Sequence, residues 1–128
     1  MTMIPSGVEI GHVYKGLTFN ELVKEPLFKL TNAAENHNGF QYQDGLNIDE
    51  IPFNPTGECQ KGGLYFATLE NIWDFLCYGA NLREVTIPDD VQVYVEEYKF
   101  KADKIFFGKN WKLDEYFTNH HEQIRLTY

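Results

Sequence analysis

The sequence has few cysteines, few basic residues and no long apolar run. Its two cysteines, Cys59 and Cys77, are too few for the disulfide framework of a small secreted domain. The opening stretch Met-Thr-Met-Ile-Pro lacks the charged region and apolar core of a signal peptide, and no segment has the length and hydrophobicity of a membrane span. We therefore expect an intracellular protein in a reducing compartment.

Basic residues are outnumbered by acidic ones. Eleven Lys and Arg stand against nineteen Asp and Glu, which gives a net charge of −8. Nucleic acids and anionic membranes need clustered Lys and Arg, so the charge argues against both as the main partner. The densest basic group contains Lys99, Lys101, Lys104, Lys109 and Lys112. Acidic residues are interleaved with these lysines, and we interpret the group as a solvated face.

The spacings of known metal and catalytic motifs are also missing. None of the four histidines or two cysteines forms an HxxxH or CxxC pattern, and the adjacent pair His120 and His121 would point in different directions. No GxSxG elbow, GxxxxGK[ST] loop or GxGxxG turn is present. We expect no metal site and no cofactor from the motifs.

The chain is rich in aromatic residues, with ten Phe and eight Tyr among 128 residues. This composition and length predict one folded domain over 1–128. Its centre is the stretch 62–88. Residues 64–67 suit a buried strand, Thr68 can cap a helix whose apolar face ends near Gly79, and the alternation over 82–87 indicates a second strand.

The flanking segments complete the predicted fold. We expect a loose leader over 1–7, a terminal helix or tail over 113–128, and further strands before and after the centre. Thr18 and Glu21 fit a capping box for a short helix that ends before Pro26. This order predicts the α+β class, with a mixed or antiparallel sheet of five or six strands and two or three helices.

One long connection, residues 46–61, contains two prolines and a glycine and is expected to be irregular. Such loops in small domains are often functional. The other interpretation is that Ile48, Ile51 and Phe53 only fix the loop over the core. Carboxylates border the loop, and with Glu84 two of them could serve as acid and base if they converged. Surface carboxylates are equally typical of an acidic protein.

Several stretches resemble a domain of giant amoebal viruses of the Mimivirus type. They are ENHNGFQYQDGLNID, IPFNPTGEC, GGLYF, YGANLREVTIPDDVQVY and KFKADKIFFG, and the resemblance covers about 27–109. In that family the domain stands alone or precedes ankyrin repeats, which are binding scaffolds. The resemblance implies a viral accessory domain, in host cytoplasm or virion, that recruits a partner.

A second resemblance is to small ADP-ribosyltransferases of the rifampin-modifying type. Val13 to Gly16 and Leu64 to Thr68 occupy the places of that family's two strand motifs. The resemblance implies NAD as cofactor and Tyr65 as the tyrosine that stacks on it. Lys15 stands where that family has a histidine, and Glu84 is the candidate acidic residue.

We expect a protein-binding surface rather than a reaction centre, because aromatic residues are enriched at interface cores. The candidate surface consists of Phe40, Tyr42, Ile51, Phe53 and Tyr65. The alternatives are the NAD-dependent transferase and a structural component of the virion, and a homo-oligomer stays open. A flat aromatic patch would favour binding. A cleft that holds Lys15, Tyr65 and a carboxylate together would favour the enzyme.

Overall fold

The computed structural model describes residues 5–56, 61–72 and 79–119, and these residues form a mostly β domain. Eight strands form one sheet in the order β1-β8-β9-β6-β2-β7-β10-β5, and each neighbouring pair is antiparallel. In chain order these strands are β1 (Val13–Lys15), β2 (Leu27–Thr31), β5 (Gly45–Ile48), β6 (Leu64–Thr68), β7 (Asn81–Thr86), β8 (Gln92–Val95), β9 (Phe100–Ala102) and β10 (Lys104–Asn110). A separate hairpin pairs β3 (Asn36–His37) with β4 (Phe40–Gln41).

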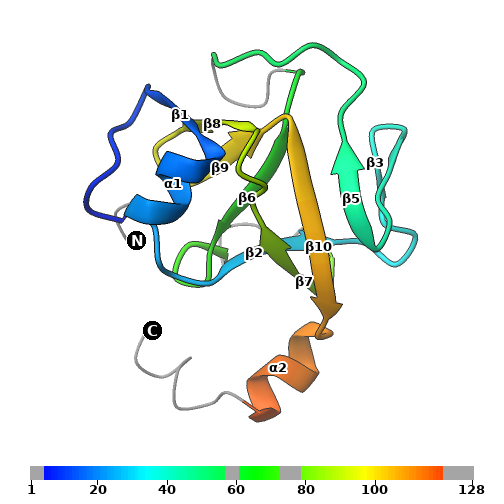
Figure 1. The fold of residues 1–128 in the computed structure, drawn as a ribbon. Coiled ribbons are helices and arrows are strands. Elements are labelled where there is room, and N and C mark those ends of the chain that lie inside the picture. The colour runs from blue at the N-terminus through cyan, green and yellow to red at the C-terminus, as the bar shows by residue number, and fades with distance from the viewer. Residues whose placement is uncertain (1–4, 57–60, 73–78, 120–128) are drawn as a thin grey trace.

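Strand β6 joins the two halves of the sheet. Its first residues, 64–66, pair with β9, whereas Ala67 and Thr68 pair with β2. Figure 1 shows β1, β8 and α1 (Gly16–Leu22) on one side of the molecule and β5 with β3 on the other. Residues of both halves contribute to one apolar core.

Two apolar clusters fill the two faces of β2. The larger cluster contains side chains of both sheet halves and Phe19 of α1, whose ring lies 5.0 Å from that of Phe100. The smaller cluster lies under α2 (Leu113–Asn119), where Tyr116 packs on Phe28 at 5.5 Å between ring centroids. Leu27 belongs to the larger cluster and Phe28 to the smaller, because successive strand residues face opposite ways.

The expected α+β class is wrong. Among the described residues there are ten strands and two helices of seven residues each, and the main sheet is larger than five or six strands. The class changes because more of the chain pairs as strands than the patterns indicated. Thr68, the expected helix cap, is the buried last residue of β6. Residues 69–72 form a turn in which the amide N of Asn71 donates to the carbonyl of Thr68. The rest of the expected central helix, 73–78, lies outside the described residues.

The helix near the N-terminus is present but starts earlier than expected. Lys15 occupies the N-cap without a side-chain hydrogen bond, so the capping box of Thr18 and Glu21 is not used. At the other end, α2 forms part of the expected 113–128 segment, and 120–128 lie outside the described residues. The leader is described from residue 5 only, where a turn follows Pro5.

Gly16 provides a test of this packing. A Cβ on Gly16 would lie 1.9 Å from the carbonyl oxygen of Pro88, whereas a Cβ on Gly108 would meet only Glu84 Oε1, at 3.3 Å. Helix propensity alone favours Ala over Gly by up to about 1 kcal/mol. We expect Gly16→Ala to lower the free energy of unfolding by about 3 kcal/mol, because the backbone of the β7–β8 turn must move.

Gly108→Ala is the matched control and should change stability by less than about 1 kcal/mol. Urea unfolding followed by tryptophan fluorescence measures both variants. A Gly16→Ala protein as stable as the wild type would show that α1 does not press on Pro88.

A candidate ligand pocket beside Tyr65

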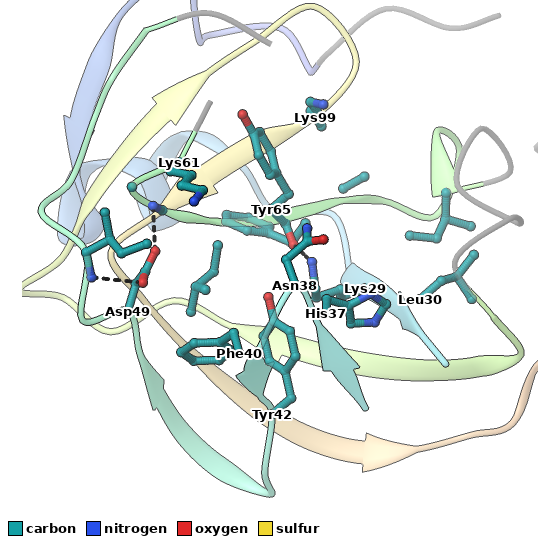
Figure 2. Close-up of a pocket in the computed structure, with 17 residues that line it drawn as sticks. Lys29, Leu30, His37, Asn38, Phe40, Tyr42, Asp49, Lys61, Tyr65 and Lys99 are labelled. Atoms are coloured by element: carbon teal, nitrogen blue, oxygen red, sulfur yellow. Dashed lines mark hydrogen bonds between the residues drawn. The ribbon is translucent and has the colours of Figure 1, made fainter. Parts of the chain in front are cut away.

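A pocket of about 450 Å³ opens between β6, the β3–β4 hairpin and the segment after β5. This volume lies within the range of roughly 300–1,000 Å³ that is typical of ligand sites. In Figure 2, Phe40 and Tyr42 lie on one side of the pocket, and Tyr65 with Lys99 lies on the other. The lining also includes Lys29, Leu30, His37, Asn38, Asp49, Ile51, Lys61, Gly62, Gly63, Leu64, Phe66, Ala67 and Ile72.

Stacked rings form the wall on the hairpin side. The ring of Tyr42 lies 5.2 Å from Phe107 in a stacked arrangement, and Phe40 packs edge-on against Tyr42 at 4.7 Å. Tyr42 is buried, and burial, followed by the nearby charge of Asp49, raises the pKa of its hydroxyl. Tyr42 therefore keeps its proton and contributes a neutral hydroxyl and an aromatic face.

Arg83 of β7 holds this wall against the sheet. Its guanidinium carbon lies 4.7 Å from the centroid of Phe107, and its Nε forms an ion pair with Glu35 at 3.1 Å. A second ion pair joins Arg83 to Asp44. Glu35 and Asp44 flank the β3–β4 hairpin on either side, so one buried cation fixes both of its ends.

The opposite wall depends on the glycine pair before β6. Both Gly62 and Gly63 have positive φ, and a Cβ on Gly62 would lie 2.3 Å from the carbonyl oxygen of Pro52. The amide N of Gly63 donates to Asp49 Oδ2 at 2.8 Å, and that of Ile51 donates to Asp49 Oδ1 at 3.1 Å (Figure 2). Both oxygens of Asp49 are thus used in holding the loop.

These contacts decide how the loop after β5 is attached. Hydrogen bonds to the backbone of the loop hold it in place. Besides the two to Asp49, the carbonyl of Asn54 accepts from Lys101 Nζ at 2.7 Å. Of the three residues expected to fix the loop over the core, Ile48 and Ile51 are about half exposed and Phe53 is half-buried. The loop supplies Asp49 and Ile51 to the pocket. Residues 57–60, including Cys59, lie outside the described residues.

Lysines surround the pocket despite the acidic composition. Lys29 of β2 donates through Nζ to the carbonyl of Tyr65 at 2.7 Å, and Lys99 Nζ lies 4.2 Å from the Tyr65 ring centroid. Lys61 is exposed at the rim. Burial, followed by the charge of Lys99, lowers the pKa of Lys29 from its ordinary 10.5 to about 7.

The expected solvated lysine face is wrong for one of its members. Lys101 is fully buried, and its Nζ lies 5.3 Å from the centroid of the Tyr65 ring. Strand β9 lies between β8 and β6 in the sheet. The side chain of Lys101 lies beside Gly63, under the loop that follows β5. Lys104 is half-exposed and pairs with Asp90 at 3.2 Å.

Four of the five residues of the expected binding surface line the pocket. They are Phe40, Tyr42, Ile51 and Tyr65, while Phe53 is half-buried and outside the lining. They surround a hollow rather than a flat patch. Their binding role stays a prediction, since geometry alone does not test it.

The candidate transferase residues are not brought together. Tyr65 lines the pocket, but Lys15 lies exposed at the end of β1, where it pairs with Gln92. Glu84 lies on β7, where its Oε2 accepts from Trp111 Nε1 at 2.5 Å. The carboxylate that does line the pocket, Asp49, is bound to two backbone amides.

The sequence interpretation missed the lysines of the pocket. Lys29 offered one signal, since it interrupts the apolar run Leu27 to Leu30 in a strand that is buried on both faces. Lys61 and Lys99 gave none, because the loops that bring them to the pocket have no recognisable spacing. Asp49 was one of several bordering carboxylates.

Two further findings concern the described residues alone. No group of three or more His, Cys, Asp or Glu side chains in them is placed to hold a metal ion. Their helices are all too short and too polar to cross a lipid bilayer. Cys77, His120 and His121 lie outside this part of the chain.

Relatives of this chain occur in Acanthamoeba polyphaga mimivirus. The "Uncharacterized protein R869" is 40% identical over 94 residues, which cover 69% of this chain and 68% of that protein. The chain belongs to this family of Mimivirus proteins. The expected resemblance to giant-virus proteins is thereby confirmed.

The domain also matches part of longer proteins. The "Putative ankyrin repeat protein R896" is 41% identical over 98 residues, and the "Putative ankyrin repeat protein R868" is 42% identical over 76 residues. These matches cover 70% and 58% of this chain, but it spans only 29% and 38% of the two relatives. No known family profile and no solved structure matches the chain.

The pKa of Lys29 predicts how stability depends on pH. Above about pH 7 the folded protein binds fewer protons than the unfolded chain, so Lys29 makes the free energy of unfolding rise with pH. Below about pH 7 both states are protonated, and the cost of burying the charge is fully present. Lys29→Met removes this titration, so its stability relative to wild type should be highest near pH 6 and should fall toward pH 9.

Chemical denaturation at a series of pH values measures the difference. Lys24→Met, at an exposed position, is the control and should follow the wild-type curve in parallel. Parallel curves for Lys29→Met and wild type would mean that Lys29 keeps an ordinary pKa.

Proposed function

We propose that this domain is a recognition module that binds a segment of a partner protein in the pocket between Tyr42 and Tyr65. One observation carries the proposal: Phe40, Tyr42, Ile51 and Tyr65 come from three segments of the chain and surround one open hollow. Tyr and Phe are the residues that interface cores favour, because they bury a large area at a small entropic cost.

The occurrence of the domain in other proteins supports the same proposal. Two relatives that contain a matching region are named as putative ankyrin repeat proteins, and this region is 38% or less of their length. Ankyrin arrays present extended binding surfaces. A second recognition element in such a chain would add a second contact, and linked contacts raise the overall affinity.

The state of the acidic groups favours binding over catalysis. Acid–base catalysis of the expected kind needs two groups that converge on the substrate. Asp49 is the one acidic residue in the described lining, and Glu84 is bonded to Trp111 outside it. The pocket therefore offers aromatic faces and ammonium groups, which suit recognition of a ligand.

Ile51 and Ile48 form a matched pair for testing the proposal. Both are about half exposed, but only Ile51 lines the pocket. We expect Ile51→Gln to weaken partner binding about fivefold, the effect of losing about 1 kcal/mol of apolar contact. Ile48→Gln should bind as the wild type does.

The partner is first identified by photo-crosslinking from a probe at Ile51 in virus-infected amoebae. Binding of the purified partner is then measured by calorimetry with each variant. The proposal fails if no protein crosslinks reproducibly, or if both glutamine variants bind the purified partner as tightly as the wild type.

The transferase alternative makes an opposite prediction. A ligand that binds only the folded state raises its melting temperature. Since Lys15 and Glu84 do not line the pocket with Tyr65, we expect millimolar NAD to leave the melting temperature unchanged. A rise that disappears in Ile51→Gln would assign the pocket to NAD.

A further inference from the structure

The charge of the pocket is opposite to that of the protein. The chain carries a net −8, yet the ionisable groups that line the pocket include three lysines and one acidic residue, Asp49. His37 and the two lining tyrosines complete the titratable set. Asp49 already accepts two backbone hydrogen bonds, so its charge is partly compensated.

The three ammonium groups reach the pocket from separate segments. Lys29 comes from β2, Lys99 lies just before β9, and Lys61 lies on the rim before β6. One N–H of Lys29 is used by the carbonyl of Tyr65, and an ammonium has three donors. Lys29 can thus bind a ligand while it stays anchored.

Burying the charged ammonium of Lys29 costs free energy when no anion lies beside it. Lys29 lies on a strand where its neighbours on both sides are buried, and its ammonium nitrogen lies 5.1 Å from the centroid of the Tyr42 ring. Lys99 lies on the same side, so the two cations repel. An anionic ligand would offset both the desolvation and the repulsion.

We propose that the pocket binds an acidic segment of the partner, in which an apolar side chain enters between Tyr42 and Tyr65 and an adjacent carboxylate pairs with Lys29, Lys61 and Lys99. This inference rests on the function proposed above and adds the chemistry of the partner. Lysine ammonium groups can pair with either a carboxylate or a phosphate as point charges. We commit to carboxylate because it is the side-chain anion that an unmodified protein segment carries at neutral pH, and phosphate is one outcome of the test.

The test uses pools of fluorescein-labelled peptides with a central Phe, Trp or Leu. One pool has Asp and Glu on both sides of the apolar residue, a second has Asn and Gln, and a third has phosphoserine. Fluorescence anisotropy with the full chain gives the affinity of each pool. We expect the acidic pool to bind at least about tenfold more tightly than the amide pool, since charge-assisted hydrogen bonds are the stronger ones.

Two charge reversals separate a local contact from the overall field. Lys61→Glu and Lys24→Glu change the net charge equally, and both residues are exposed, but only Lys61 lines the pocket. We expect Lys61→Glu to weaken binding of the acidic pool about tenfold, whereas Lys24→Glu should stay within about twofold.

Four outcomes would overturn the inference. They are equal binding of the acidic and amide pools, equal effects of the two charge reversals, preference for the phosphoserine pool, and binding of none of the pools. A crosslinked partner whose binding depends on Ile51 but whose segment is neutral would overturn only this inference. The recognition function itself would then stand.

Discussion

The buried guanidinium of Arg83 holds the pocket side of the domain together. It packs on Phe107 and pairs with Glu35 and Asp44 on the two sides of the β3–β4 hairpin. The hydroxyl of Thr31 donates to the same Glu35 at 2.7 Å. Removing one partner of a buried pair leaves a charge without compensation, so the hairpin is bound to the sheet by an interaction that is costly to break. Phe40 and Tyr42 are placed by it.

The wall on the Tyr65 side depends on backbone segments that pack closely together, and not on a buried ion pair. Gly62 and Gly63 have no Cβ, which lets Pro52, Asn54 and the stem of Lys101 come within distances that any other residue would block. Asp49 and Lys101 then bond the backbone of the loop. The described parts of the loop are thus held to the segment before β6 and to β9 by hydrogen bonds. Recognition sites benefit from segments that are held in place, because less order has to be created on binding.

The strands could be predicted from local patterns, and their order could not. Residues 64–67 and 82–87 were expected as strands and closely match β6 and β7. Thr68 was expected to cap a helix, and it is the buried last residue of β6, followed by a turn over the described residues 69–72. Strand β2 lies between β6 and β7, so the two strands of the expected central unit are not neighbours in the sheet. Pairing between distant segments leaves no local signal.

The residues of the candidate site could likewise be predicted in part, whereas their arrangement around a pocket could not. The aromatic surplus and the long connection pointed to Phe40, Tyr42, Ile51, Phe53 and Tyr65, because aromatic residues are enriched both in cores and in contact surfaces. That four of these residues surround a hollow depends on tertiary contacts, which place the β3–β4 hairpin opposite Tyr65. The sequence treated Lys101 as part of a solvated group, yet its ammonium lies beside the Tyr65 ring.

The sequence by itself determined the aromatic and acidic character of the chain and its resemblance to the Mimivirus family. Composition depends only on which residues are present, and motifs depend only on their order along the chain. The tertiary structure alone decided the mostly β architecture, the pocket and its positive charge. The physical reason is that hydrogen bonds between strands, and burial of charges beside rings, join residues that lie dozens of positions apart along the chain.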